Sequence, residues 1–307
     1  MTPLVPLASP AIAVGMKEGH RQRLQSIWGQ ARLLLAIVAL LWAGNSIVGR
    51  AARDVVPPVM LAWGRWAGAL LILLPFAWRH LRADRAVLLR HWKVVLLLGL
   101  LGIASFNTLL YLSLQETTAT NSLLIQSGTP AIILLLAWLM FRDPVDPREA
   151  AAVALSMTGV LVIVGRGSLT ELAAFRIHAG DGLMLIATLV WAIYSVLLRW
   201  RPQVHPLSFL AATFAVGVVA VFPLMLVEHW NGARIVWSWG SAGALGYVAF
   251  FPSLIAYLLY NRGVELIGAG AAGQFITLTP LFGAGLALIL LGEPLRGYHL
   301  VGLVLIV

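Results

Sequence analysis

The chain has 307 residues, of which 60% are hydrophobic and 11% are charged, and its formal net charge is +9. Soluble domains are about half apolar and roughly a quarter charged, so this composition excludes an ordinary soluble fold and favours helices that face lipid. The basic residues lie in short segments between apolar runs, which indicates membrane topology and argues against nucleic-acid binding. The sequence contains no cysteine, which excludes disulfides, thiolate chemistry and cysteine-based metal sites.

Residues 1–31 are predicted to form a cytoplasmic N-terminal tail. Pro6 and Pro10 interrupt the apolar stretch of this segment, and its basic residues follow that stretch, whereas the basic residues of a signal peptide precede the apolar region. The segment is therefore not interpreted as a cleaved leader, and Met16 is an alternative start.

The rest of the chain is predicted to cross the membrane ten times, because about 20 apolar residues of helix span the hydrocarbon core. The last predicted span has about 11 residues, which at ~1.5 Å per residue is too short to cross ~30 Å of hydrocarbon. We therefore expect the sequence to stop inside that span. The predicted spans are 32–51, 57–78, 93–114, 119–140, 149–166, 181–199, 206–227, 238–260, 268–291 and 297–307.

The distribution of Lys and Arg between the spans predicts the orientation. With a cytoplasmic N-terminus, 14 of these residues fall on the cytoplasmic side and six on the outer side. The segment between the second and third spans, expected to be a loop, contributes most of the excess, while Arg50 and Arg53 oppose it. The bias predicts a cytoplasmic N-terminus in a bacterial inner membrane.

Two stretches in the second halves of the first and sixth spans resemble each other. Leu41–Arg50 reads LWAGNSIVGR and Val190–Arg199 reads VWAIYSVLLR, at an offset of 149 residues. Four of the ten positions are identical, which indicates an internal repeat.

A second pair of motifs supports this repeat. A Thr-Pro dipeptide ends at Pro130 and again at Pro280, and thirteen residues after each proline an acid, Asp143 or Glu293, precedes another proline. Five spans is an odd number, so the half 168–307 is predicted to cross the membrane upside down relative to the half 32–167. Inverted repeats place a substrate site near the midplane, which opens alternately to each side. The predicted fold is therefore an all-α polytopic membrane protein, with ten transmembrane helices in two inverted five-helix repeats around a central cavity.

Polar and aromatic residues recur at helical spacing within six of the spans, so each set shares one helix face. Inside a bilayer such groups must face protein or water, and a central cavity satisfies all six faces. The alternative is that they only tie helices together, at about 0.6 kcal/mol per hydrogen bond. The predicted substrate-binding residues are Trp42, Asn45, Ser46, Asn107, Tyr111, Gln126, Trp191, Tyr194, Ser195, Tyr257, Tyr260, Gln274 and Thr277.

Three further residues are singled out within the spans. Pro130 and Pro280 each remove a backbone hydrogen bond, which predicts either a static kink or a paired hinge. Arg65 is the sole charge well inside a span, and it is expected either to reach the outer surface by snorkelling or to contact a substrate carboxylate. No Asp, Glu, Lys or His is expected at membrane depth, which argues against proton coupling through a buried acid and against polyphosphate cargo.

The residues that carry this pattern resemble the EamA family of the drug/metabolite transporter superfamily. The matching features are the Trp-Ala openings of spans 1 and 6, the run Pro58–Arg65, the Thr-Pro pairs and the Glu-Pro after span 9, while Asp143-Pro144 departs from the usual Glu-Pro. The resemblance implies ten helices, a central cavity and small organic substrates. Within the family the chain is most similar to YddG-type bacterial amino-acid exporters.

These observations predict a secondary transporter, an exporter or facilitator of neutral or zwitterionic metabolites, above all amino acids including aromatic ones. The alternatives are a transporter of another metabolite or a drug-like cation, and a passive channel. An enzyme is not expected, because the sequence offers no nucleophile with an adjacent base and no metal-ligand pattern. The expected partners are a small-molecule substrate and the lipid bilayer, without cofactor, metal or nucleic acid, and the oligomeric state is left open.

Overall fold

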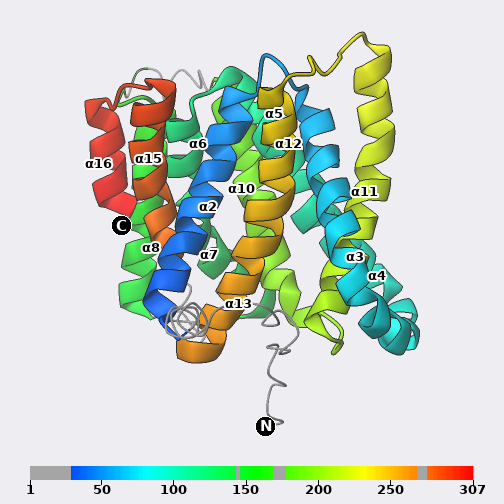
Figure 1. The fold of residues 1–307 in the computed structure, drawn as a ribbon. Helices are drawn as coiled ribbons and strands as arrows, with labels where there is room; N and C mark the ends of the chain where they lie inside the picture. The colour runs from blue at the N-terminus through cyan, green and yellow to red at the C-terminus, as the bar shows by residue number, and fades with distance from the viewer. Residues whose placement is uncertain (1–28, 143–145, 169, 171–177, 268–274, 307) are drawn as a thin grey trace.

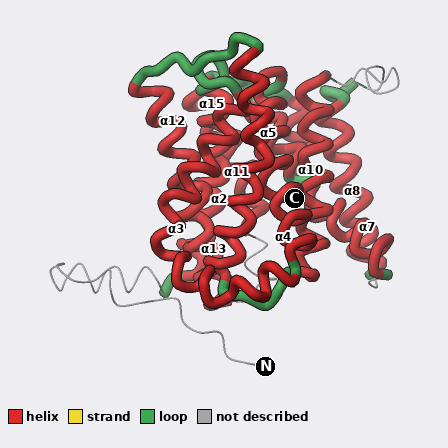
Figure 2. The backbone as a smooth tube through the Cα atoms, turned by 90° about the vertical axis from the view of Figure 1, so that its right-hand side faces the viewer, coloured by secondary structure: helices red, strands yellow, loops and turns green. Residues whose placement is uncertain are grey.

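The computed structural model describes residues 29–142, 146–168, 170, 178–267 and 275–306. The described part contains helices and connecting segments but no strand, and the helices stand side by side with their loops at two ends (Figures 1 and 2). We call the end where α2 finishes and α3 begins the upper end, as drawn in Figure 1, and the opposite end the lower end.

The elements follow one another in an up-and-down order along the chain (Figure 1). Their bounds are α2 Ala31–Ala51, α3 Pro58–Arg90, α4 Trp92–Leu98, η2 Gly99–Ser105, α5 Phe106–Glu116, α6 Ala119–Gln126, α7 Thr129–Phe141, α8 Pro147–Val164, α10 Ala179–Leu197, η3 Leu198–Trp200, α11 Pro206–Trp230, α12 Trp239–Phe250, η4 Phe251–Ile255, α13 Ala256–Ile267, η5 Phe275–Thr277, α15 Leu278–Leu291 and α16 Gly297–Ile306.

Seven of the predicted spans are confirmed as helices, or runs of consecutive helical segments, long and apolar enough to cross a membrane. The other three coincide with shorter apolar helices, Ala150–Val164, Phe275–Leu291 and Gly297–Ile306. The chain is thus an all-helical, multi-pass membrane protein, and the full set of ten crossings in two inverted halves stays a prediction.

The segment expected to be a loop after the second span is helical, which corrects the sequence prediction. Helix α3 continues for 33 residues to Arg90, about 50 Å at ~1.5 Å per residue, well beyond the ~30 Å of the hydrocarbon core. The segment from residue 76 to 90 is rich in Leu, Ala and Arg, which favour helix, and has neither Gly nor Pro. A charged segment was therefore mistaken for a loop, although charge ends a membrane span and not a helix.

Two membrane helices contain wide π-helical turns that sequence periodicity does not predict. The run Trp92–Glu116 contains η2, and the run Trp239–Val264 contains η4. A hydroxyl group stabilises each widened turn: Thr108 Oγ1 donates to the carbonyl of Ala104 at 2.6 Å, and Ser253 Oγ donates to the carbonyl of Val248 at 2.8 Å. Such turns often occur at functional sites, and here they lie next to residues predicted to bind substrate.

The helix that contains the first Thr-Pro pair is broken. Helix α6 ends at Gln126 and α7 begins at Thr129, with Pro130 in its first turn. The hydroxyl of Thr129 donates to the carbonyl of Gln126, which replaces the bond that the proline cannot make. In the second pair, Thr279 is buried but its Oγ1 has no hydrogen-bond partner.

Helices α3 and α11 form the main packing pair of the bundle. Trp66 of α3 and Phe214 of α11 are both buried, with ring centroids 4.8 Å apart. A close approach beside them depends on Gly217, because a Cβ atom there would lie 2.3 Å from Ile103 of η2. This pair provides a rigid wall for the polar groups described next.

Candidate functional site

Arg65 is a buried charge in the N-terminal part of α3. It is 4% exposed, and its guanidinium donates to Ser253 Oγ at 2.9 Å, Asn45 Oδ1 at 2.7 Å and the Tyr111 hydroxyl at 3.2 Å. The Tyr111 hydroxyl also donates to Asn45 Oδ1 at 2.7 Å. We call these four residues the Arg65 cluster, and they join α2, α3, α5 and η4.

The position of Arg65 corrects one expectation from sequence. The side chain does not snorkel to a surface, because its contacts are all inside the bundle. Burying an arginine at membrane depth costs about 2.5–3.5 kcal/mol on insertion scales. Among the described residues no carboxylate lies within ion-pair distance of Arg65, so only neutral groups offset this cost.

Three of the predicted residues meet in an aromatic cluster between α2 and α13. The ring of Trp42 lies 6.2 Å from that of Tyr257 and 5.6 Å from that of Tyr260. The indole N–H of Trp42 donates to the carbonyl of Pro252 at 3.3 Å, where η4 widens the backbone. All three rings are partly exposed.

A second aromatic cluster joins α10 to α5. Trp191 packs 4.8 Å from Phe106 and 5.0 Å from Tyr194, measured between ring centroids. The Tyr194 ring sits against Gly102 of η2, where a Cβ atom would lie 2.5 Å from it. Sequence analysis placed Trp191 and Tyr194 in the site but missed Phe106, which no polar pattern marks.

The remaining predicted residues are placed as follows. Ser46 is buried, Ser195 Oγ donates to the carbonyl of Trp191 at 2.8 Å, and Asn107 is 3% exposed with an Oδ1 atom that has no hydrogen-bond partner. The bond of Ser195 fits the interpretation that some of these groups serve packing. Gln274 lies outside the described residues.

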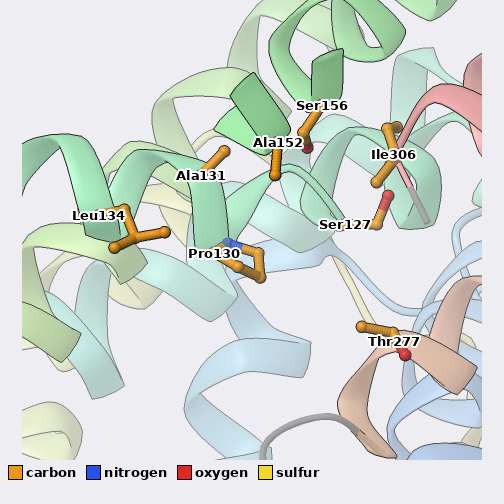
Figure 3. Close-up of a pocket in the computed structure, with 8 residues that line it drawn as sticks. All are labelled: Ser127, Pro130, Ala131, Leu134, Ala152, Ser156, Thr277 and Ile306. Carbon is orange, nitrogen blue, oxygen red and sulfur yellow. The ribbon is translucent and has the colours of Figure 1, made fainter. Parts of the chain in front are cut away.

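Two hollows lie to the sides of these clusters. The smaller, about 150 Å³, is lined by Pro130, Thr277, Ser127 and Ser156 among others, whose side chains Figure 3 shows around it. The larger, about 430 Å³, lies between the upper parts of α2 and α12, and Tyr247 lines it. Of the predicted binding residues only Thr277 lines either hollow, and the central cavity stays a prediction.

A clasp at the upper end of the bundle was not predicted. The carboxylate of Glu293 accepts hydrogen bonds from the backbone of Ala119 at 2.9 Å and of Thr120 at 3.0 Å, and from the Thr120 hydroxyl at 2.9 Å. It also lies 3.8 Å from Arg50, which donates to the carbonyl of Leu114 at 2.6 Å. An acid at the N-terminus of α6 complements the helix dipole, and the recurring acid-Pro dipeptide, Asp143-Pro144 and Glu293-Pro294, was the signal that could have found it.

A buried acid that the sequence did not single out lies beside this clasp. Asp181, in the first turn of α10, is 0% exposed and accepts bonds from the Thr117 hydroxyl at 2.5 Å and the Asn121 amide at 3.3 Å. His299, 4% exposed, lies 2.8 Å from Asn121 Oδ1. Both sit at helix starts, where sequence reading assigned them to span ends.

A second carboxylate caps another helix at the upper end. Glu228, near the end of α11, accepts hydrogen bonds from the backbone of Val59 at 3.1 Å and of Met60 at 2.8 Å, at the start of α3.

At the lower end, the rings of His80 and His205 stack with their centroids 3.6 Å apart. No group of three or more potential metal ligands occurs in the described ranges.

The chain belongs to the EamA-like transporter family, whose model matches it twice, at residues 30–165 and 178–307. The two matches agree with the repeat read from the sequence, and the family assignment from the motifs is confirmed.

Individual relatives are transporters by name. An uncharacterized transporter of Bacillus subtilis, YyaM, is 28% identical over 82% of this chain and 82% of its own length. A transporter of Archaeoglobus fulgidus is 29% identical, over 86% and 90%. The S-adenosylmethionine/S-adenosylhomocysteine transporter of Chlamydia trachomatis is 22% identical, over 86% and 82%. One crystal structure, 18% identical, shares the fold with a TM-score of 0.58, over 90% of this chain and 93% of its own.

Proposed function

We propose that this protein is a secondary transporter, an exporter or facilitator of small zwitterionic or neutral metabolites, above all amino acids including aromatic ones. It works by alternating access in the bacterial inner membrane, with the upper end facing outside and the N-terminus in the cytoplasm. The observation that carries this proposal is that the Arg65 cluster and the two aromatic clusters occur in the same bundle, because together they offer polar and aromatic contacts inside an apolar protein.

The relatives support a transported solute of this chemical class. One relative is named for S-adenosylmethionine, a molecule that itself carries an α-amino acid group. A drug-like cation is the second candidate, since aromatic rings attract cations, but the uncompensated charge of Arg65 opposes it. A passive channel would show no saturable counterflow.

The test is counterflow of the twenty labelled amino acids into liposomes that contain the purified protein, with empty liposomes as background. In Trp191→Ala we expect about tenfold slower transport, equal to ~1.4 kcal/mol and near the upper range for one aromatic contact. Trp239→Ala is the matched control, because Trp239 is 95% exposed at the start of α12. If no amino acid enters faster than into empty liposomes, the substrate class is wrong.

A further inference from the structure

Arg65 retains unused capacity to bind an anion. Its hydrogen bonds to the described residues use Nε and Nη1, and none of them uses Nη2. Arg50, by contrast, has Glu293 at 3.8 Å. A guanidinium presents a planar fork of N–H donors that matches a carboxylate, so the Arg65 cluster lacks the one group that would neutralise its charge.

A second unsatisfied group faces the same side of α5. Asn107 is 3% exposed, and its Oδ1 atom is buried without a hydrogen-bond partner. Nearly all buried acceptors in proteins are paired, so an unpaired one calls for an explanation. Asn107 lies four residues before Tyr111, hence on the same helix face. Because helical side chains lean toward the N-terminus, the Tyr111 ring extends over the turn that holds Asn107.

The chemistry of these two groups selects a ligand class. A ligand that satisfies both offers an anionic group to the guanidinium of Arg65 and a hydrogen-bond donor to Asn107 Oδ1. An α-amino carboxylate has this arrangement.

Helix packing does not require a cation at the Arg65 position. Helix α3 begins at Pro58 and contains Pro75, and helix α11 begins at Pro206 and contains Pro223. The corresponding prolines of the two helices are 148 residues apart, since 206 − 58 and 223 − 75 both equal 148. At that offset Arg65 corresponds to Thr213, whose hydroxyl is satisfied by the carbonyl of Phe209 at 2.9 Å. The second segment thus builds the same helix with a neutral residue.

The lower end of the larger hollow lies beside the Arg65 cluster. Tyr247 and Val48 are its lowest lining residues, and the Tyr247 hydroxyl lies so close to Gly44 that a Cβ atom there would be 2.2 Å away. Gly44 directly precedes Asn45 of the Arg65 cluster. A hollow of about 430 Å³ is within the ordinary size of small-molecule sites, and the Tyr247 side chain lies at its lower end.

We propose that Arg65 binds the carboxylate of the transported solute while Asn107 accepts a hydrogen bond from its ammonium group, and that a solute from the upper side passes Tyr247. This inference rests on the proposed function and narrows its substrate class to α-amino carboxylates. It assigns the aromatic clusters to the remainder of the solute.

The first test needs no variant. Labelled phenylalanine in counterflow is competed with unlabelled phenylalanine, phenylalaninamide, phenethylamine and 3-phenylpropionate; if another amino acid is the one transported, the matching four compounds are built on it. Phenylalanine should compete at least about tenfold better than the amide and the amine, which lack a carboxylate. Equal competition by the amide overturns the inference and leaves the proposed function standing, whereas transport of no amino acid defeats both.

Variants then separate the two contacts. Arg65→Lys keeps the charge but loses the fork, and should reduce the preference for phenylalanine over the amide about tenfold. Arg82→Gln, an exposed arginine on the same helix, should keep the wild-type preference. Asn107→Leu should weaken competition by phenylalanine but not by 3-phenylpropionate, at an unchanged or raised melting temperature. A lowered melting temperature with unchanged selectivity would show that Asn107 is structural.

Discussion

Glu293 at the upper end lies near Arg50 and accepts three hydrogen bonds from the start of α6, whereas Arg65, deeper in the bundle, is held by neutral groups alone. The first arrangement satisfies its charges within the protein, so it is expected to stabilise the fold. The second leaves the cation of Arg65 without a carboxylate partner among the described residues, as expected of a group that binds a ligand, the role proposed for it above. Under this proposal the completeness of pairing, and not burial alone, separates the structural charge from the functional one.

The largest effect on stability is expected for Glu293→Ala. The change leaves two backbone N–H groups and a hydroxyl without their acceptor, and we expect a loss of about 2–3 kcal/mol in the free energy of unfolding. Thermal unfolding of the purified protein in detergent measures it. Glu116→Gln, an exposed acid at the end of α5, is the control and should stay within about 0.5 kcal/mol of wild type.

Arg65→Gln should show the opposite profile. Removing the charge relieves a desolvation cost of about 2.5–3.5 kcal/mol, which offsets the lost hydrogen bonds, so stability should change little. Counterflow of amino acids should nevertheless fall to the level of empty liposomes. A melting temperature that drops as far as in Glu293→Ala would place Arg65 among the structural charges and remove the contrast.

The two Thr-Pro pairs give a smaller, internal comparison. Thr129→Val removes the hydroxyl that satisfies the carbonyl of Gln126 and should cost about 1 kcal/mol. Thr279→Val removes a buried hydroxyl that has no partner, so it should be neutral or stabilising. Equal losses in the two variants, measured by thermal unfolding, would contradict the assignment of Thr129 as the replacement donor.

The smallest effect concerns pH at the lower end. Burial lowers the pKa of His205, the stacked His80 lowers it further, and Asp84 raises it in part. Above pH ~6.5, the usual histidine pKa, His205 is neutral in both the folded and the unfolded chain. As pH falls below that value the unfolded chain takes up the proton first, so the free energy of unfolding should decrease.

Unfolding curves measured between about pH 7.5 and about pH 5, a range that includes the ordinary histidine pKa, test this expected decrease in the free energy of unfolding. In His205→Gln the decrease should be shallower than in wild type, with His178→Gln, an exposed histidine, as the control. A steeper decrease in His205→Gln would mean that the folded protein, and not the unfolded chain, binds this proton more tightly.

The sequence predicted the helical membrane fold and the family, because hydropathy and the recurring Trp-Ala and Thr-Pro motifs are local signals. It also selected Asn45, Asn107 and Tyr111 by their helical spacing. It did not predict that Ser253 Oγ accepts a hydrogen bond from Arg65 and donates one to the carbonyl of Val248. Arg65 and Ser253 are 188 residues apart in the sequence, and their contact depends on the wide turn η4. Phe106 was missed because an apolar ring among apolar residues carries no periodic signal of its own.

The two buried acids near the ends of spans were missed for a different reason. Glu293 and Asp181 lie where hydropathy falls, so they were interpreted as the ends of spans, and their partners are at least 60 residues away in the sequence. Only the folded bundle shows that each carboxylate meets the backbone or amide of a helix from the other family segment.

The length of α3 sets a limit on how this bundle can move. About 20 Å of this helix projects past a ~30 Å hydrocarbon layer, and the projecting part carries Arg79, Arg82, Arg85 and Arg90. Drawing these cations into lipid is costly, so α3 can rock but cannot slide along its own axis. Helix α11 packs beside α3 through Trp66 and Phe214, so we expect this pair to stay in place. Under the proposed alternating access, the change between outward and inward openings would then be made by the helices around the pair.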